Sequence, residues 1–274
     1  MIRRLALLPA LAVFAWPGQL AASDGVGRMN VTPTRVVAGA KGVALVFTFT
    51  ADRGALRGQT LIDVPRLWPM PQASQPSAPG YVALQRGSCG SGTRIARVVG
   101  RKILIAAVCG RGGRYTLTYA PVDAPTVSTD GYVFLTQTKP APPTGASKQA
   151  RRRLRFRPLA PSKQPIVAVA GAPVDHLQVS ATTIATAGTA FGLTVRAVDA
   201  YGNTAGGYVN SVTFSSTDPA ATLPIPYQFS GADAGSHAFS GVILRTPGAQ
   251  RITATDSAGH VGTSNAISVS GGSR

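Results

Sequence analysis

Short runs in which apolar and polar residues alternate follow one another along the first half of the chain. Alternation of this kind places apolar side chains on one face of an extended segment, and β-branched and aromatic residues favour strands. The runs are 43–51, 59–65, 95–99, 103–108, 114–120 and 131–139. The proline-rich stretch 67–81 between them reads as a loop. With no helical period between the runs, we predict an antiparallel β-sandwich over about residues 26–138.

The same pattern returns in the second half, over about residues 174–270. Its runs are 175–181, 190–200, 208–218, 237–246, 249–257 and 265–271, separated by turn residues. In VDAYGNTAGG (198–207) a strand runs into a turn, where Asp199 and Asn203 can bond nearby backbone amides and Gly202 can adopt a positive φ. We predict a second sandwich here.

The composition agrees with strands and turns. All ten acidic residues are aspartates, and the chain contains no glutamate, which is the stronger helix former of the two. The fold class that we predict is therefore all-β.

The first of these modules resembles a module of secreted bacterial proteins with immunoglobulin-like folds. The segments that carry the resemblance are VTPTRVVAGAKGVALVFTFTA, the proline-rich loop with Trp68, GYVALQRGSCG, RYTLTYA and DGYVFLTQT, which together cover about 110 residues. The resemblance implies a fold and no catalytic residues. One departure is that Arg94, Arg97, Arg101 and Lys102 stand where that family usually has serine or threonine. We expect these residues to form a basic face.

The second module resembles the immunoglobulin-like repeats of bacterial surface and secreted proteins, with filamin-like and invasin-like features. The matching segments are ATAGTAF (185–191), LTVRAVDAYGN (193–203), FSSTDPAATLP (214–224) and the stretch 227–256. This resemblance implies a seven-stranded sandwich that serves as a spacer, a stalk or an adhesive surface. Because one fold hosts many functions, the step from fold to role is an analogy. The predicted architecture is thus two immunoglobulin-like antiparallel β-sandwiches joined by a Pro/Arg-rich linker.

The amino-terminal residues, MIRRLALLPALAVFAWPGQLAAS, have the features of a secretory signal peptide. Arg3 and Arg4 precede an apolar stretch, 5–16, and small residues end the segment at 21–23. A retained membrane anchor is the alternative, although the apolar stretch is shorter than the roughly 20 residues of a membrane span. We expect a secreted, extracellular or cell-surface protein with a signal peptide at 1–23.

Two cysteines, Cys89 and Cys109, flank two predicted strands that turn at residues 100–102. Pairing about this turn would bring the cysteines together, so we predict a disulfide, as suits an oxidising compartment. Two free or buried thiols are the alternative.

Charge divides the chain into a basic module, a very basic connector and a nearly neutral module. Residues 24–138 hold thirteen basic and five acidic residues, a net charge of +8. Residues 139–165 hold eight basic residues and no acidic one, again +8, whereas 175–274 hold four basic and five acidic residues, −1. With the signal peptide, we expect four segments: 1–23, a sandwich at 24–138, a basic proline-rich linker at 139–173, and a sandwich at 174–274.

The connector could bind an anionic partner. In an extended chain the arginines of RRRLRFR at 151, 153, 155 and 157 would share one side, and Leu154 and Phe156 the other. The residues that we predict for this binding are Arg151, Arg152, Arg153, Arg155, Arg157, Arg97, Arg101 and Lys102. Three alternatives remain open: a solvated spacer, a protease-sensitive junction that releases one module, and an extra strand formed by residues 154–169 on a neighbouring module.

Catalytic and metal-binding patterns find little support. Asp233 and Ser236 beside His237 suggest a triad, but no nucleophile motif surrounds the serine, and turn chemistry accounts for the aspartate. The other histidines, His176 and His260, lack zinc-ligand spacing. Three aspartates could meet at one end of the sandwich and bind Ca²⁺, although we favour a role in turns; they are Asp199, Asp218 and Asp256. We predict no catalytic residue, metal site or small-molecule cofactor.

These observations predict a non-enzymatic, exported structural or adhesive protein of the bacterial cell surface. The alternative is a binder of anionic polymers, namely an acidic glycan, a teichoic-type polymer, lipopolysaccharide or extracellular DNA. The expected partners are such a polymer or another surface protein, and peripheral membrane contact fits the basic connector.

Overall fold

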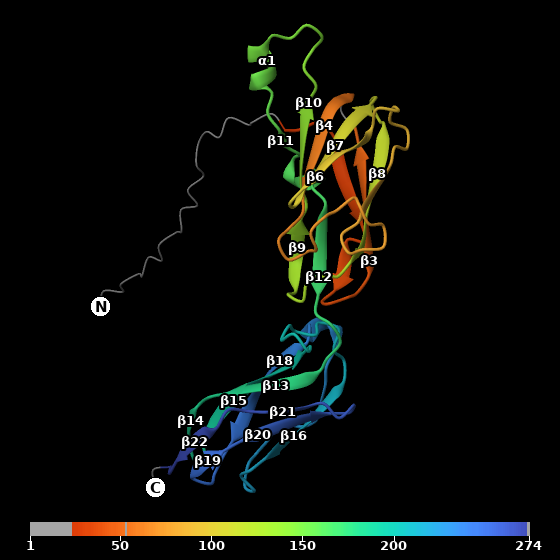
Figure 1. Ribbon diagram of the computed structural model, residues 1–274. Coiled ribbons are helices and arrows are strands. Elements are labelled where there is room, and N and C mark those ends of the chain that lie inside the picture. Colours follow the sequence, from red (N-terminus) through yellow and green to blue (C-terminus); the bar gives the residue numbers. More distant parts are fainter. Residues whose placement is uncertain (1–23, 53, 273–274) are drawn as a thin grey trace, which may run out of the picture.

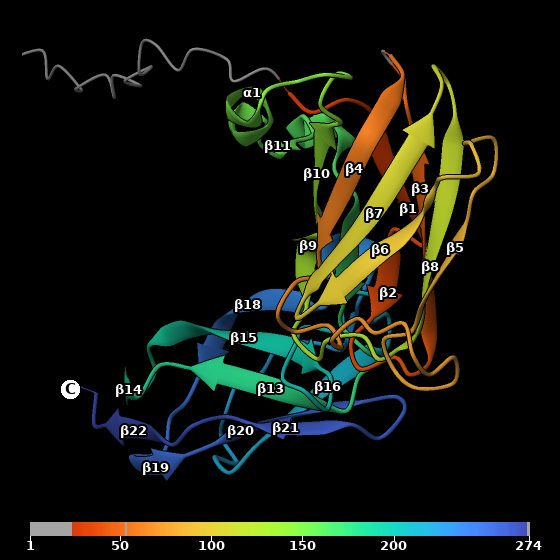
Figure 2. The ribbon, with the colours of Figure 1, turned by 45° about the horizontal axis from the view of Figure 1, so that its top comes forward.

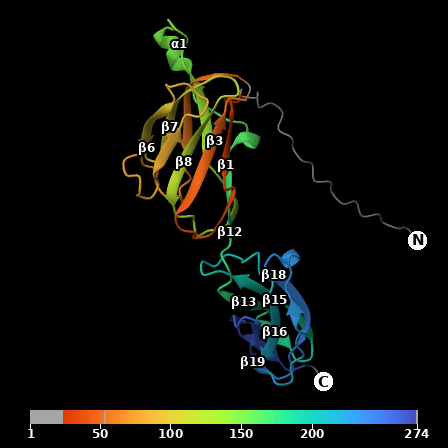
Figure 3. The same ribbon diagram turned by 90° about the vertical axis from the view of Figure 1, so that its right-hand side faces the viewer.

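A computed structural model describes residues 24–52 and 54–272, and its regular secondary structure is almost entirely β-strand (Figure 1). The predicted signal peptide lies outside the described residues. Two separate hydrophobic cores lie one after the other along the chain, the first from Met29 to Val169 and the second from Leu177 to Val269. Each core is enclosed by β-sheets whose strands pair mostly antiparallel, and the two bodies stack end to end (Figures 1 and 3). This confirms the predicted all-β fold class.

Two sheets form the faces of the first sandwich. The four-stranded sheet contains, in spatial order, β1 (Arg28–Thr32), β3 (Val43–Thr50), β8 (Arg114–Val122) and β5 (Val82–Gln85). The five-stranded sheet contains β11 (Arg157–Pro158), β10 (Leu135–Pro140), β4 (Leu56–Asp63), β7 (Lys102–Cys109) and β6 (Arg94–Val99). The alternation read from the sequence buries every second residue of β3, including Leu45, Phe47 and Phe49.

A third, smaller sheet closes the side of the first sandwich. It contains β2 (Arg35–Val37), β12 (Ile166–Ala170) and β9 (Thr129–Val133), with β12 in the middle. Strand β12 runs parallel to β2 and antiparallel to β9. Its Val167 and Val169 side chains are buried in the first core.

The position of β12 corrects the expected linker at 139–173. Residues 157–158 and 166–170 pair with strands of the first sandwich, and Leu159 between them is buried. The run IVAVA can bury two valines on one face, and this removal of apolar surface from water favours a strand over a solvated spacer. The connection between the two sandwiches is only residues 171–175. The alternative of an extra strand over residues 154–169 is correct in part, because two shorter strands form there, at 157–158 and 166–170.

The other half of the expected linker, residues 141–156, leaves the sandwich as an exposed excursion. It carries the helix α1 (Lys148–Arg153), none of whose residues is buried. Figures 1 and 2 show α1 at the end of the first sandwich that points away from the second. A short 3-10 helix, Pro161–Lys163, then leads toward β12.

Phe134 explains why the predicted strand at 131–139 is two strands. Its side chain is fully buried and packs 4.9 Å from the ring of Phe47 and 5.4 Å from that of Trp68, measured between ring centroids. Strand β9 before it and β10 after it belong to different sheets. Trp68 itself comes from the proline-rich loop, which therefore supplies one of the largest side chains of the core.

The predicted disulfide between Cys89 and Cys109 is confirmed, with a Cα–Cα distance of 4.4 Å. Strands β6 and β7 form the predicted hairpin, in which Val99 pairs with Lys102 across a two-residue turn and Gly100 has a φ of 53°. The crosslink closes a loop with a sequence separation of 20 residues. A loop of this size contributes roughly 3 kcal/mol of stability in the chain-entropy account.

The second sandwich is built from three sheets, shown in green to blue in Figure 1. The first contains β13 (His176–Ala181), β15 (Ala190–Val198) and β18 (Ser236–Ile243). The second contains β14 (Ile184–Thr186), β22 (Ile267–Ser270) and β19 (Gly248–Gln250). The third contains β17 (Tyr227–Gln228), β16 (Ser211–Ser216), β20 (Ile252–Asp256) and β21 (Val261–Thr263). A 3-10 helix, Gly231–Asp233, precedes β18.

Candidate functional site

The turn that follows β15 is built around the buried carboxylate of Asp199. Its Oδ1 accepts hydrogen bonds from the backbone N–H of Tyr201 at 2.9 Å and of Asn203 at 2.8 Å. Gly202 has a φ of 84°, which only glycine adopts without strain. The sequence predicted this turn, and the structure shows the bonding expected for Asp199.

A second turn of the same construction follows β20. Asp256 Oδ1 accepts from the N–H of Ala258 at 2.9 Å and of His260 at 2.8 Å, and Gly259 has a φ of 91°. The two turns share the spacing Asp-x-x-Gly followed by a polar residue, in DAYGN and in DSAGH. The spacing is present twice in the sequence, and only the first of the two turns was predicted from it.

The second carboxylate oxygen of Asp256 joins distant parts of the second sandwich. Asp256 Oδ2 accepts from the Tyr208 hydroxyl and from Asn210 Nδ2, both at 2.9 Å, and lies 2.8 Å from His260 Nδ1. Burial opposes ionisation of this carboxyl. The hydrogen bonds from Asn210, His260 and Tyr208 outweigh burial and lower its pKa to about 2. Asp256 is therefore an internal anchor.

The second oxygen of Asp199 instead reaches the connection between the sandwiches. Asp199 Oδ2 accepts from the N–H of Ala172 and from Asn203 Nδ2, each at 2.8 Å. Burial opposes ionisation, but the hydrogen bonds from Asn203, Ala172 and Tyr201 prevail and hold the pKa of Asp199 below its ordinary value. The carboxylate fixes residue 172 of the short linker onto the second sandwich.

Asn203 continues this network across the junction to the first sandwich. Its Nδ2 donates to the carbonyl oxygen of Thr126 at 2.8 Å, and its Oδ1 accepts from the N–H of Ser128 at 2.9 Å. Tyr201 of the same turn packs against Gly39, where an added Cβ would collide with the tyrosine ring. One turn of the second sandwich thus holds two loops of the first.

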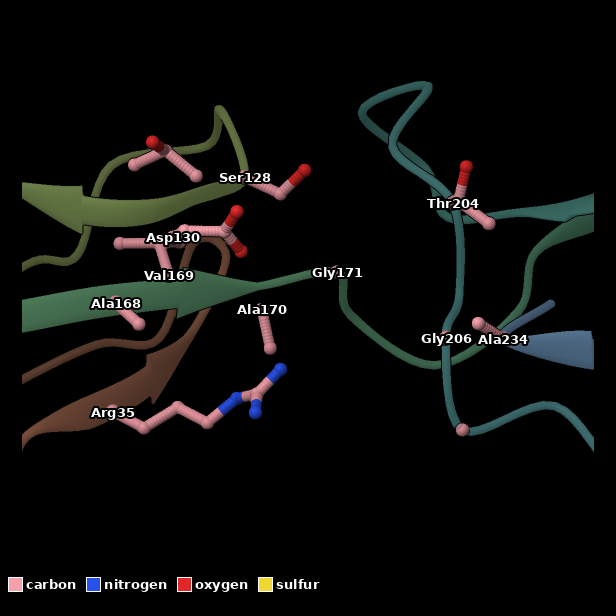
Figure 4. Close-up of a pocket in the computed structure, with 12 residues that line it drawn as sticks. Arg35, Ser128, Asp130, Ala168, Val169, Ala170, Gly171, Thr204, Gly206 and Ala234 are labelled. Atoms are coloured by element: carbon pink, nitrogen blue, oxygen red, sulfur yellow. The ribbon is translucent and has the colours of Figure 1, made fainter. Parts of the chain in front are cut away.

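Beside this junction lies an open cleft of about 680 Å³ (Figure 4). The first sandwich contributes the side chains of Arg35, Ser128 and Asp130. The second contributes Thr204, Gly206 and Ala234, and the end of β12 runs along the cleft. The lining is mostly backbone and small side chains, and its charged residues are Arg35 and Asp130. These groups do not form a catalytic site.

The arginines predicted to bind anions through the excursion are exposed, but not in the predicted arrangement. Arg151, Arg152 and Arg153 lie in α1, which Ser147 caps by accepting from the N–H of Ala150 at 3.1 Å. Successive helical residues point about 100° apart, so the predicted alternation of an extended chain was wrong here. Arg155 is also exposed and donates to the carbonyl oxygen of Arg152. Arg157 lies in β11.

The other predicted basic residues lie elsewhere on the first sandwich. Lys102 pairs with Asp63 across the strands, and Asp63 pairs with Leu135, whereas the excursion begins after Pro140 at the far end of β10. The turn of the β6–β7 hairpin and the excursion are thus at opposite ends of one sheet. Arg97 is exposed on the edge strand β6. The predicted set does not form a single surface.

Arg101 has a structural role that the sequence did not suggest. Its Nη1 donates to the carbonyl oxygens of Pro65 at 2.7 Å and Trp68 at 2.9 Å, and its Nη2 donates to that of Arg66. These hydrogen bonds from the guanidinium stabilise the turn at residues 65–68, from which the side chain of Trp68 enters the core. Three of its five donor positions are therefore taken by protein carbonyl groups, which argues against Arg101 as a ligand-binding residue.

The residues that suggested catalysis form a capped turn. Asp233 Oδ2 accepts from the N–H and the hydroxyl of Ser230, at 2.8 and 2.9 Å, and Asp233 Oδ1 lies 2.7 Å from His237 Nδ1. The bonds from Ser230 and His237 lower the pKa of Asp233 to about 2. The ring of Tyr227 stacks on that of His237, with centroids 4.0 Å apart. Turn and packing chemistry account for this cluster, and it offers no positive evidence of catalysis.

The three aspartates considered for Ca²⁺ do not meet. Val212 pairs with Asp256 at one end of the β16–β20 pair, whereas Asp218 follows the other end, beyond Ser216. There its carboxylate accepts from the N–H groups of Arg245 and Thr246. Across residues 24–52 and 54–272, no group of three or more histidine, cysteine or acidic side chains could hold a metal ion. Within that same part of the chain, no helix is long and apolar enough to cross a membrane.

Comparison with models of known protein families gave no match, and comparison with curated proteins gave none. Among solved structures, the Escherichia coli adhesin FdeC is 15% identical, with a TM-score of 0.41, over 91% of this chain and 64% of that one. The Yersinia pseudotuberculosis adhesin InvE is 14% identical (TM-score 0.29; 89% and 58%). A red sea bream transglutaminase is 8% identical (TM-score 0.24; 89% and 31%).

The chain therefore spans less than two thirds of the length of each of these structures. The neighbours include bacterial adhesins and an enzyme. Similarities this low carry no argument about function, which has to come from the molecule itself.

Proposed function

We propose that this protein is a non-enzymatic, exported structural or adhesive protein that holds two immunoglobulin-like sandwiches at a fixed separation and orientation, at the cell surface or outside the cell. The single observation that carries the proposal is the bridge from Asn203 to Thr126 and Ser128. A side chain of one sandwich there satisfies two backbone groups of the other.

The connection between the sandwiches supports a stiff spacer. Residues 171–175 follow β12 directly and lead directly into β13, so both ends are fixed in sheets. Between them, the N–H of Ala172 is bonded to Asp199, and the N–H of Asp175 donates to the carbonyl oxygen of Val198 at 2.7 Å. A linker with its backbone held at two points has little freedom to bend, unlike a flexible chain of the same length.

Replacing Asn203 with alanine should loosen the junction and leave both sandwiches folded. The substitution removes both bonds to the first sandwich, so small-angle scattering of the chain without residues 1–23 should show a broader distribution of inter-module distances. Asn265→Ala is the matched control, because Asn265 bonds Ala181 and Thr182 inside the second sandwich. An Asn203→Ala protein with the scattering profile of the unchanged protein would refute a junction held by this residue.

A second candidate function is binding of an anionic polymer, and the excursion 141–156 favours it. Lys148, Arg151, Arg152, Arg153 and Arg155 are all exposed there. No acidic residue occurs between residues 139 and 165 to neutralise them. Arginine suits bidentate contact with phosphate, sulfate or carboxylate groups. The exposed position at one pole of the molecule would leave these groups available to a long polymer.

Retention on heparin across a salt series tests this second function. Replacing Arg151, Arg152, Arg153, Arg155 and Arg157 with serine should lower the eluting salt concentration and flatten the salt dependence, by roughly 0.7–0.9 in log–log slope for each cation engaged. The control variant, Arg97→Ser with Lys102→Ser, removes two positive charges from the β6–β7 hairpin, outside the excursion. It should elute at the same salt concentration as the unchanged protein. Equal elution of all three proteins at low salt would exclude the excursion as a polymer-binding site.

A further inference from the structure

We propose that the excursion 141–156 is a processing site for an endoprotease of trypsin-like specificity, and that cleavage there produces a two-chain protein in which both sandwiches stay together. Three features of the described residues support such a site. The excursion is accessible, it concentrates the residues that such a protease recognises, and the chain after it is held in the first sandwich.

The excursion can open without disturbing the core. None of the residues of α1 is buried, and its bonds are local, such as Arg151 N–H to the carbonyl oxygen of Ser147 at 3.0 Å and Arg151 Nε to that of Ala146 at 3.1 Å. A six-residue helix has little stability of its own in water. The two ends are anchored, by Ala141 N–H bonded to the carbonyl oxygen of Arg57 and by β11 paired with β10. An exposed loop of this kind is where proteases cut folded proteins.

The sequence of the excursion fits a protease with an acidic specificity pocket. Such a pocket takes lysine or arginine on the amino-terminal side of the cut bond, and five candidates fall within eight residues: Lys148, Arg151, Arg152, Arg153 and Arg155. The reaction is hydrolysis. One water molecule adds across the peptide bond, so the basic residue gains a carboxylate and the next residue becomes a new amino terminus.

The segment after the cut is held in the first sandwich. Strand β12 lies between β2 and β9, with Val167 and Val169 buried. Ahead of it, Lys163 Nζ lies 2.9 Å from Asp52 Oδ2, with both side chains at least four-fifths buried. The side chain of Gln164 bonds the backbone of Thr136 in β10: its Oε1 accepts from the N–H at 2.8 Å, and its Nε2 donates to the carbonyl oxygen at 3.1 Å. These contacts do not depend on the covalent link to β10.

The same specificity protects the junction between the sandwiches. No lysine or arginine occurs between Lys163 and Arg196, so a trypsin-like enzyme has no target in residues 171–175. The product is a nicked protein that keeps both modules, whereas cleavage at a protease-sensitive junction would release one of them.

Limited digestion with trypsin of the protein lacking residues 1–23 tests the proposal. A denaturing gel should show two fragments, and mass spectrometry should place the cut between residues 148 and 156. Under native conditions the nicked protein should elute from a size-exclusion column with the intact protein. Replacing Lys148, Arg151, Arg152, Arg153 and Arg155 with serine should slow the first cut by about tenfold or more, because cleavage at other sites needs a larger opening of the fold. Arg94→Ser with Arg97→Ser is the matched control and should be cut at the unchanged rate.

Two results would overturn the proposal: a first cut outside the excursion, or fragments that separate under native conditions. A further variant tests the role of β12 in retention. In Ala168→Pro the proline removes the N–H that bonds the carbonyl oxygen of Thr34 at 2.8 Å. The fragments of this nicked variant should separate more readily than those of the unchanged protein, and equal retention would contradict the role of β12.

Discussion

Replacing Val167 with aspartate should destabilise the first sandwich strongly and leave the second intact. Val167 is fully buried, lies in β12 and pairs with Tyr132 of β9. A carboxylate placed there would lack a partner and would lose the burial of the valine. We expect a loss of about 4 kcal/mol or more in the free energy of unfolding.

Fluorescence of Trp68 can measure this effect in the first sandwich alone. The chain contains two tryptophans, Trp16 and Trp68, and Trp16 lies in the predicted signal peptide. In protein without residues 1–23, a denaturant titration followed by tryptophan fluorescence therefore reports the core that contains Trp68. The adjacent Ile166→Asp is the matched control, because Ile166 is 41% exposed and should cost less than about 1 kcal/mol. Similar losses for the two variants would mean that β12 is not part of the core in solution.

Among the polar residues of the second sandwich, Asp256 should cause the largest loss of stability when it is replaced. Asp256→Ala leaves five donor groups without their acceptor, on Tyr208, Asn210, Ala258 and His260. We expect the free energy of unfolding of the second sandwich to fall by about 3–5 kcal/mol. Circular dichroism during denaturation can follow this transition. The control is Asp175→Ala. The carboxylate of Asp175 is more than half exposed, and within the described part of the chain its side-chain partner is the neighbouring His176.

The same carboxylate should make the stability of the second sandwich depend on pH. The pKa of Asp256 is lowered from 3.8 to about 2 in the folded protein. Its contribution is therefore complete above the unfolded value and is lost as the pH falls from about 4 toward about 2. Asp218 and Asp233 have pKa values lowered to about 2 as well and act in the same direction. Asp256→Asn should reduce, without abolishing, the dependence of the free energy of unfolding on pH over this range. An unchanged dependence on pH would contradict the lowered pKa of Asp256.

The sequence predicted most long strands, because alternation is a local signal. Residues 43–51, 103–108 and 190–200 all contain a strand close to the expected position. The run IVAVA at β12 has the same alternation, but the prolines and arginines before it favoured a linker. What makes it a strand is its pairing with Arg35–Val37, more than 130 residues earlier, and with β9. Long-range pairing of this kind leaves no mark in the local pattern.

The candidate site was predicted less well, for a related reason. Arg101 looked like part of a basic face, but its partners are carbonyl groups of residues 65–68, which no side-chain pattern reveals. Arg151–Arg153 are as exposed as expected, although their helix replaces the extended alternation. The turns at Asp199 and Asp256 are the opposite case. Their bonds run within five residues, so the spacing Asp-x-x-Gly is enough to predict them.

The late position of β12 also determines when the first sandwich can be completed during synthesis. A ribosome makes the amino-terminal end first, so β2 and β9 exist as nascent chain well before their shared neighbour. Until Ala170, of 274 residues, has emerged, both strands keep unpaired edges, which are sites for pairing with other chains. The first sandwich, although it comes first in the chain, therefore cannot complete its fold before residue 170 has been made. In a truncated chain that ends before β12, the place between β2 and β9 would stay empty, and these strand edges would stay unpaired.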